Sequence, residues 1–249
     1  LGDVYKRQVL SLYNEWQLMK TRLSKALAKA GIASRRAAEE LIVAGAVRVN
    51  GETIRIPQFP VDPSIDLIEY KNRRIELLEH LSYYIMNKPK GYLCAHVRRK
   101  GEKLVYDLFP RSHSRLFTVG RLDKDTTGLL LVTNDGQFAQ RIAHPSYECE
   151  KEYLACCSES ITPDHIKKLM RGCMIEGKRA IPKKVVSVSR SKLLITLQEG
   201  LKREIRVLIK QCNLTLLSLE RIRIGKLFLS DLPQGSYREM TSREKACFF

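Results

Sequence analysis

The sequence predicts an α+β protein in two parts: a small domain of helices and a hairpin, then a larger domain with a mixed, mostly antiparallel sheet. Two observations lead to this prediction. Residues 21–56 combine two short helical patterns with one alternating strand pattern. Beyond residue 80, strand and helix patterns mix without the regular alternation that is typical of a parallel βαβ protein. The 249 residues, of which 44% are hydrophobic, are enough to build a core in each part.

The first residues resemble an artefact rather than a protein. The stretch DVYKRQ (Asp3–Gln8) is similar to the translation of a transposon-end sequencing adapter. It also does not have the basic start, apolar core and small-residue cleavage site of a signal peptide. We therefore expect residues 1–19 to be a non-native or disordered leader and the natural protein to start at or near Met19. The expected domains are then 20–80 and 81–249.

The charge of the chain points to a polyanionic partner. The formal net charge is +17, and such an excess most often serves to bind nucleic acid and sometimes an anionic membrane. The alternative is a basic protein that is merely soluble. Residues 81–249 carry 31 Lys and Arg against 17 acids, so the larger domain is also expected to meet the polyanion. No apolar run reaches the roughly 18 residues that a membrane span needs.

The seven cysteines do not form a pattern for a disulfide framework or a zinc site. Their number is odd, and none of them belongs to a Cys-x-x-Cys pair. Reduced thiols in a cytoplasmic protein are the simplest interpretation. The five histidines add no metal-ligand spacing, so no metal site is expected.

The small domain shows two helices and a hairpin in about 36 residues. A helical pattern over 23–30 stops at Gly31, and Ser34 is a favourable N-cap for a second helix that Gly45 ends. Asn50-Gly51 lies between alternating apolar residues and predicts a tight hairpin turn. The expected inward residues of the second helix are Ala37, Ala38, Leu41 and Ile42. Residues 57–80, with three prolines, read as a boundary region.

Two arginines begin the second helix of this domain. Arg35 and Arg36 lie where backbone N–H groups also point outward, which favours phosphate binding. A solvated helix end is the alternative on local evidence. Residues 21–56 closely resemble the alpha-L RNA-binding domain first recognised in a small-subunit ribosomal protein. The resemblance implies that the face around the second helix contacts structured RNA, through Arg22, Lys25, Ser34, Arg35 and Arg36.

The larger domain alternates between strand and helix patterns. Residues 83–91 are expected to form a strand that runs into a Pro/Gly turn, and residues 128–136 a buried strand closed by an Asn-Asp-Gly turn. Further strands are expected within 150–157 and 192–200, and helices over 163–172 and 202–212. On the second of these helices, Arg203, Arg206 and Lys210 share one face, while Ile205, Leu208 and Ile209 share another. Arg206 can therefore face a cleft while the helix stays anchored.

Three aspartates stand in GRLDKDTTGLLLVTNDG, residues 120–136. A calcium loop starting at Asp123 would need a glutamate at its twelfth position, where the chain has Asn134. A glycosidase pair of Asp123 and Asp125 is disfavoured because near neighbours in a loop seldom point across a substrate. Asp135 is expected to serve the turn, and Asp125 to order the loop. Asp123 remains open as a functional residue.

The stretch 119–136 is similar, almost residue for residue, to the signature of the RsuA/RluB family of ribosomal RNA pseudouridine synthases. NKPKG (87–91), Lys151-Glu152-Tyr153, QEGLKREIRVLI (198–209) and residues 221–241 match further family motifs. With the small domain, the resemblance covers about residues 21–243. It implies that Asp123 is catalytic, that Arg206 pairs with it, and that Tyr153, in one motif with Lys151, packs on the target base. Arg121 is expected to steer phosphate or the extruded nucleotide.

The chemistry that the resemblance implies needs few groups. The N1–C1′ bond of a uridine is broken and a C5–C1′ bond is formed, without a redox step or energy input, so no cofactor is implied. A carboxylate can act as nucleophile or as base. A cation such as Arg206 beside Asp123 favours the charged carboxylate. The base must leave its stack, and basic surface with an aromatic platform offsets that cost.

Two departures from the family pattern stand in the late motif. The family usually has a basic residue where this chain has Leu201, and often a second basic residue where it has Val207. Because Arg206 is retained, we expect activity to survive. The expected partner is ribosomal RNA or a pre-ribosomal particle, with the large subunit slightly favoured, and the expected state is a monomer. The alternatives are a non-catalytic, ribosome-associated RNA-binding protein of the same fold and, more distantly, a glycosidase.

Overall fold

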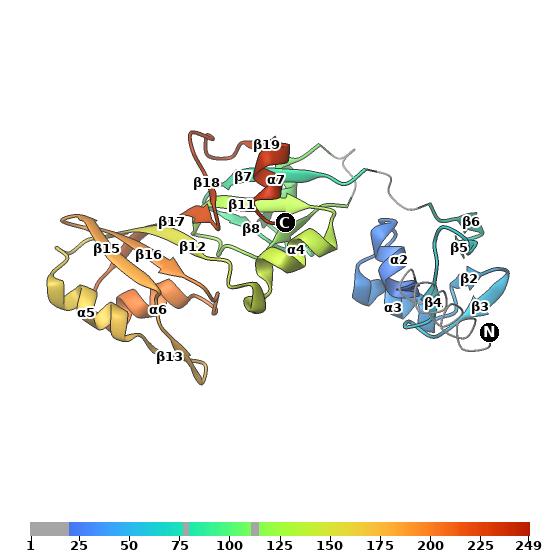
Figure 1. Ribbon diagram of the computed structural model, residues 1–249, viewed down its shortest axis with the longest axis horizontal. Helices are drawn as coiled ribbons and strands as arrows, with labels where there is room; N and C mark the ends of the chain where they lie inside the picture. Colours follow the sequence, from blue (N-terminus) through green and yellow to red (C-terminus); the bar gives the residue numbers. More distant parts are fainter. Residues whose placement is uncertain (1–19, 77–79, 111–114) are drawn as a thin grey trace, which may run out of the picture. The chain divides into compact units, whose positions relative to one another are not determined.

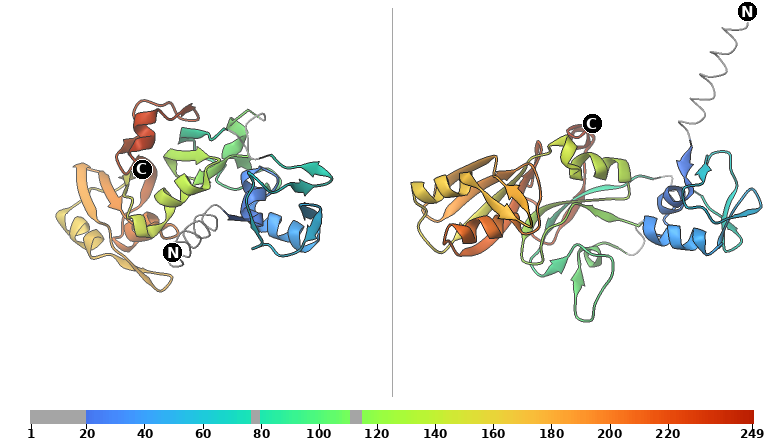
Figure 2. Two further views of the ribbon diagram at one scale, coloured as in Figure 1. Left: turned by 45° about the vertical axis from the view of Figure 1, so that its right-hand side comes forward. Right: turned by 90° about the horizontal axis from the view of Figure 1, so that it is seen from below.

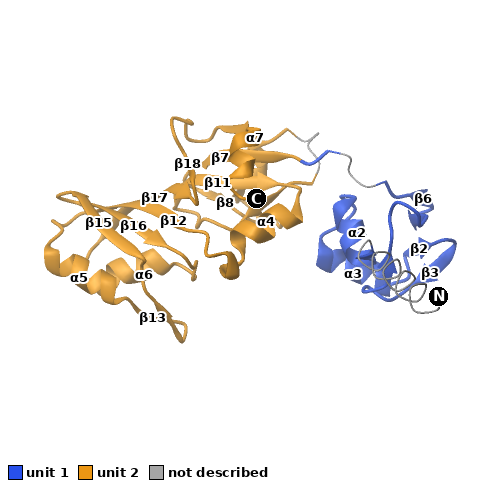
Figure 3. Ribbon diagram, in the orientation of Figure 1, with its two compact units in different colours: residues 1–81 blue, residues 82–249 orange. Residues whose placement is uncertain are grey.

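The computed structural model describes residues 20–76, 80–110 and 115–249. The chain divides into two compact units, residues 1–81 and residues 82–249 (Figure 3). The predicted leader, residues 1–19, lies outside the described residues. None of the helices in the described ranges has the length and apolar content that a membrane crossing requires.

The first unit has the predicted helices and hairpin. Ser34 caps α3 (Arg35–Val43) by accepting a hydrogen bond from the Ala37 backbone N–H at 3.2 Å, and Gly31 follows the end of α2 (Leu23–Lys29). Strands β2 (Val47–Val49) and β3 (Glu52–Ile54) pair across Asn50 and Gly51, both of which have positive φ. The apolar alternation after the turn stops with β3, because Ile56, two residues beyond Ile54, lies outside the strand and is exposed. The buried residues of the two helices and β2 form one core.

The segment 57–80, expected to be a boundary, contributes strands to this unit. β5 (Ile68–Tyr70) pairs with β2, and β6 (Arg73–Arg74) pairs with β5. β4 (Pro60–Val61) pairs with β1 (Thr21–Arg22). Buried Val61 and Ile68 join the core, which explains why this stretch folds despite its prolines and acids.

A large sheet organises the second unit (Figure 1). Its strands run in the order β15 (Lys184–Ser189), β16 (Lys192–Leu197), β12 (Lys151–Cys157), β17 (Leu216–Ile224), β11 (Thr127–Thr133), β7 (Tyr83–Lys88) and β19 (Tyr237–Glu239). β10 (Phe117–Val119) also pairs with β11, and β18 (Leu227–Phe228) with β17. The β11–β17 pair is parallel and the other pairs of this sheet are antiparallel, which confirms the predicted α+β class.

The apolar run of β11 is buried on both faces of the sheet. Leu129 and Leu131 pack with α4 (Gly136–Ala143) and the segment near α7 (Ser242–Ala246). Leu130 and Val132 pack on the other face with the 3₁₀ turn η1 (Val105–Leu108). This explains a continuous run where a half-buried strand would alternate. Figure 2 shows α4 on one side of the sheet and the arm with β8 (Tyr92–Leu93) and β9 (Lys103–Leu104) on the other.

The other half of the sheet carries two helices on one face. α5 (Pro163–Arg171) and α6 (Glu204–Gln211) pack on β12, β16 and β17 through a core that includes Leu169, Leu193 and Leu208. Both helices were predicted. α4 was not, and it corrects the interpretation of Asp135, which caps that helix by accepting from the N–H groups of Gln137 and Phe138. The hairpin of β13 (Cys173–Ile175) and β14 (Lys178–Ala180) follows α5.

Candidate active site

The loop between β10 and β11, residues 120–126, is held in place by hydrogen bonds from the buried side chain of Lys88. This side chain is fully buried, and its Nζ donates to the carbonyl oxygens of Pro89 (3.0 Å), Lys124 (3.3 Å) and Thr126 (2.9 Å). Burial lowers the pKa of Lys88 from its ordinary value. Buried Leu122 anchors the same loop in the core. The loop therefore has little freedom, and the side chain between these anchors is Asp123.

Asp123 forms an ion pair with Arg206 of α6. Arg206 Nε lies 3.5 Å from Asp123 Oδ2, and the two side chains are 21% and 37% exposed. Arg206 Nη2 also donates to Thr126 Oγ1 at 3.2 Å. One guanidinium thus connects α6 to both the carboxylate and the loop that carries it.

A cleft of about 410 Å³ opens around this pair. A ligand site of this size holds a small molecule or one nucleotide base with its sugar. Tyr153 of β12 lines it, and apolar side chains complete the wall beneath the charged groups. The lining residues are Arg121, Leu122, Asp123, Thr126, Tyr153, Leu197, Gly200, Leu201, Lys202, Arg203, Glu204, Ile205, Arg206 and Leu219.

The start of α6 forms one wall of the cleft. Arg203 precedes the helix with a left-handed backbone, φ 58°. Glu204 is only 5% exposed, and its Oε2 accepts a hydrogen bond from the Leu201 N–H at 2.9 Å. Burial, partly offset by that hydrogen bond, raises the pKa of Glu204 from its ordinary value. The buried carboxyl thus ties the loop at Leu201 to the helix that presents Arg206.

The structure brings together four of the five residues predicted for this site. Asp123, Tyr153, Arg206 and Arg121 line the cleft, whereas Lys151 does not. The Lys151 Nζ donates to the Gln198 carbonyl at 3.4 Å, and burial lowers its pKa. Lys151 thus contacts the chain just before the α6 wall of the cleft.

The other aspartates lie apart from the cleft lining. Asp125 is exposed, and Asp135 accepts a hydrogen bond from Tyr83 Oη at 2.8 Å in addition to capping α4. The three aspartates of the predicted motif are therefore separated by the structure. Asp123 alone among them lines the cleft.

The predicted RNA-contacting residues of the first unit are mostly on its surface. Arg22, Arg35 and Arg36 are exposed, and Lys25 is half-buried. Arg35 and Arg36 begin α3, as expected. The Ser34 hydroxyl oxygen accepts the hydrogen bond that caps α3, and its O–H can still donate to a phosphate oxygen.

Comparison with known proteins identifies the family. The family model described as RNA pseudouridylate synthase matches residues 82–211, and that of the S4 domain matches residues 21–64. The chain belongs to the RNA pseudouridylate synthase family. It is 39% identical over 229 residues to the ribosomal large subunit pseudouridine synthase B of Bacillus subtilis, covering 90% of this chain and 93% of that protein.

Two further comparisons agree with this assignment. A crystal structure described as a pseudouridylate synthase superposes with a TM-score of 0.68 at 28% identity, covering 92% of this chain and 99% of that one. An Arabidopsis thaliana protein, SVR1, whose name assigns it provisionally to the chloroplastic ribosomal large subunit pseudouridine synthases, is 41% identical. That match covers 93% of this chain and 62% of the plant protein, so the chain spans less than two thirds of it.

Two cleft-associated residues of this pseudouridylate synthase were missed from the sequence. Lys88 lies in the NKPKG stretch. Its position before a proline at the end of a buried strand was a usable signal for a structural role. Glu204 stands in the first turn of a predicted helix, where an acid is usually a solvated partner of the helix dipole. Nothing local indicates that this carboxyl is buried in the cleft wall.

Proposed function

We propose that this protein converts one specific uridine of ribosomal RNA, in the large subunit, to pseudouridine, with Asp123 as the catalytic residue. The ion pair of Asp123 and Arg206 in an open cleft carries the proposal. The reaction breaks the N1–C1′ bond, turns the uracil and forms a C5–C1′ bond, while C5 loses a proton and N1 gains one. The atoms balance without a co-reactant, so we propose no cofactor.

Asp123 is proposed to act as nucleophile or base on the bound nucleotide. Its carboxylate has a fixed position because Lys88 and Leu122 anchor its loop on either side. Arg206 places a positive charge beside this carboxylate, and a cation fixed in this way costs no reorganisation during the reaction. The Tyr153 ring offers a flat surface on which the extruded base can stack.

The substrate class is supported by the relatives and by charge. Two of the relatives are named for the ribosomal large subunit, and the match to the S4 domain covers the part of the chain in which the RNA-binding surface was predicted. A-form RNA is bound mainly through its backbone and shape, which suits the exposed arginines of α3. We propose that a monomer acts on ribosomal RNA or a pre-ribosomal particle in the cytoplasm.

The test is pseudouridine mapping at nucleotide resolution on both ribosomal RNAs from a strain that lacks the gene. One large-subunit site should lose its modification, and the wild-type gene should restore it. Asp123→Asn should restore nothing while binding RNA as the wild type does. Asp125→Asn, a change in the same loop outside the cleft lining, is the matched control and should restore the site.

The same experiment decides the second candidate. A non-catalytic RNA-binding protein of this fold would leave every pseudouridine in place, and Asp123→Asn would complement any growth defect fully. A lost site in the small subunit instead would keep the reaction and overturn the proposed subunit.

A further inference from the structure

A row of cations leads away from the cleft along α6. Arg203 and Arg206 line the cleft, and Lys210 follows one turn after Arg206 on the same side of the helix. Arg203 and Lys210 are exposed, so their charges face solvent. The opposite side of the helix, with Ile205, Leu208 and Ile209, is buried in the core. The exposed stripe of α6 is therefore basic from its first turn to its last.

A second hollow lies beside the last turns of α6, on the flank of the helix that faces α5. It encloses about 190 Å³ and is lined by residues of α5 and α6 and by Cys173, the first residue of β13. Two exposed cations of α5, Lys168 and Arg171, line it together with the Gln211 side chain at the end of α6. Cations and an amide donor around a small hollow suit a phosphate group.

The four cations have no ionic partner in the described part of the chain. No carboxylate lies within 4.0 Å of Lys168, Arg171, Arg203 or Lys210 among the ion pairs of the described residues. Elsewhere the protein does pair its arginines, as Arg223 shows with Glu150 and Glu152. The dipoles of α5 and α6 favour cations near the C-terminal ends of these helices. This interaction does not neutralise the cations, so their charges can still bind a ligand.

Helix α6 separates the hollow from the cleft, so its length sets the distance between them. The eight residues of α6 span about 12 Å, so the hollow is one short helix away from the cleft wall. We propose that Arg203, Lys210, Lys168 and Arg171 form a basic track that binds the phosphate backbone of the RNA strand flanking the target uridine. The proposal rests on the proposed function for the identity of the RNA.

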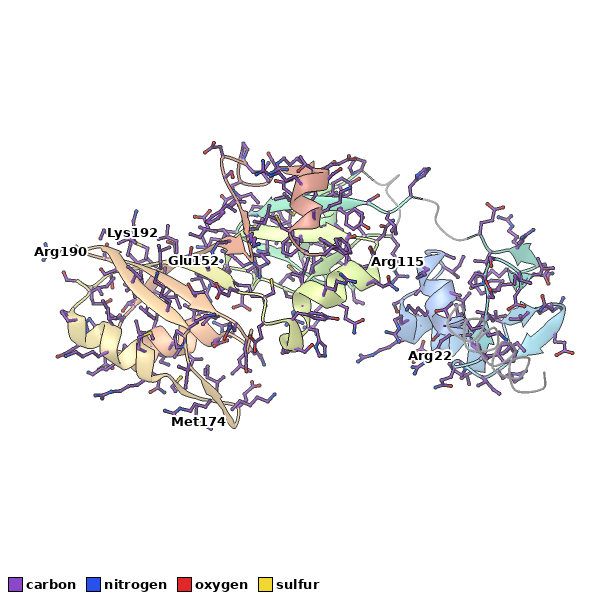
Figure 4. All side chains as sticks on the ribbon, viewed as in Figure 1. Arg22, Arg115, Glu152, Met174, Arg190 and Lys192 are labelled. Carbon is purple, nitrogen blue, oxygen red and sulfur yellow. The ribbon has the colours of Figure 1, made fainter. Side chains whose placement is uncertain are left out.

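The opposite face of the same half-sheet supplies a matched control. Lys184 and Lys192 are exposed and alternate with Val185 and Leu193, which are buried against the helices. They therefore point away from α5 and α6. Figure 4 shows Lys192 on the side of the sheet away from Met174 and the two helices. These two lysines carry the same charge as Lys168 and Arg171 but lie off the track.

The test compares Lys168→Ala/Arg171→Ala with Lys184→Ala/Lys192→Ala in the full chain. The probe is a large-subunit ribosomal RNA fragment, and binding is measured by fluorescence anisotropy between about 50 and 200 mM salt, the range over which phosphate contacts dominate. The track variant should bind roughly tenfold more weakly, with a salt slope reduced by about 1 to 2. The control variant should bind as the wild type does.

Turnover separates this proposal from the proposed function. The track variant should show a higher KM and an unchanged kcat on the long fragment, and wild-type kinetics on a short fragment cut close to the target uridine. Equal binding by track variant and wild type, or an equal loss in both double variants, would overturn the track. A wild type that forms no pseudouridine would overturn the proposed function alone, because the binding measurement still decides the track.

Discussion

The Arg206 guanidinium holds two groups of the β10–β11 loop at once. Its Nε lies 3.5 Å from Asp123 Oδ2, while its Nη2 donates to Thr126 Oγ1 at 3.2 Å. Thr126 is buried, so the second contact fixes the plane of the guanidinium. The guanidinium beside the carboxylate is thereby positioned by a second contact, and a charge positioned in advance can stabilise another charge without reorganisation.

This double contact predicts that a lysine cannot replace Arg206. Arg206→Lys keeps the charge, but a single ammonium lacks the planar fork that reaches both partners. Single-turnover pseudouridine formation should fall by about 100-fold or more, the scale seen when one preorganised donor is removed. Arg206→Ala should be at least as slow. If Arg206→Lys turned over as fast as the wild type, charge alone would explain the residue's role.

Lys88 is predicted to hold the loop that carries Asp123 without contacting the substrate. Lys88→Met keeps the apolar stem but leaves the carbonyls of Pro89, Lys124 and Thr126 without their buried donor. The free energy of unfolding should fall by about 2 to 4 kcal/mol, because the variant loses hydrogen bonds donated by a charged group. Turnover should fall as well, because the Asp123 loop loosens. Lys90→Met, a change at an exposed residue two positions later, is the control. It should alter neither the free energy of unfolding in urea nor the turnover rate.

The elements that the sequence predicted are those whose signals are local. Gly31, Ser34 and Asn50-Gly51 act through their own backbone, and the motif around Asp123 is continuous in the chain. α4 was missed because Asn-Asp-Gly suits both a turn and a helix start. What decides for the helix is the packing of Phe138 and Ile142 on β11.

The cleft itself depends on contacts between distant residues. Lys88 and Thr126 are 38 residues apart, and Thr126 and Arg206 are 80 apart. No spacing within the sequence encodes such pairs. The resemblance supplied Arg206, and the place of Lys88 at the end of a buried strand was a usable signal. The role of Glu204 comes only from its burial, which local charge and polarity argue against.

Gly128 is predicted to be irreplaceable at the start of β11. Its φ is +102°, and a Cβ there would overlap the backbone carbonyl oxygen of Arg221 in the parallel strand β17. Gly128→Ala should lower the free energy of unfolding by about 2 to 4 kcal/mol, from backbone strain plus overpacking. Gly136→Ala, where a Cβ would meet open space in the first turn of α4, should be neutral or stabilising. Urea unfolding of the two variants checks this, and similar losses in both would contradict it.

Tyr83 is predicted to make the stability of the second unit depend on alkaline pH. Burial, followed by the hydrogen bond to Asp135, raises the pKa of Tyr83 to about 12 from the ordinary 10.0. The folded state therefore favours the protonated phenol. Its contribution is complete below pH 10 and is lost as the pH rises towards 12. Tyr83→Phe should be less stable than the wild type at pH 8, by about 1 to 2 kcal/mol, and the gap should narrow at pH 11. A gap that is constant from pH 8 to pH 11 in urea unfolding would show that ionisation of Tyr83 is not coupled to folding.

Glu204 is predicted to position Arg206 rather than to react. Its buried carboxyl accepts the Leu201 N–H and so holds the left-handed turn at Arg203 from which α6 starts. Glu204→Gln keeps an acceptor oxygen and should retain most of the turnover. Glu204→Ala leaves the N–H unpaired and should lower both kcat and stability, the latter by about 1 to 3 kcal/mol. Because the effect on kcat runs through Arg206, adding Glu204→Ala to Arg206→Ala should slow the reaction little further. A full additional loss of kcat in the double variant would show that Glu204 acts on the substrate by a separate route.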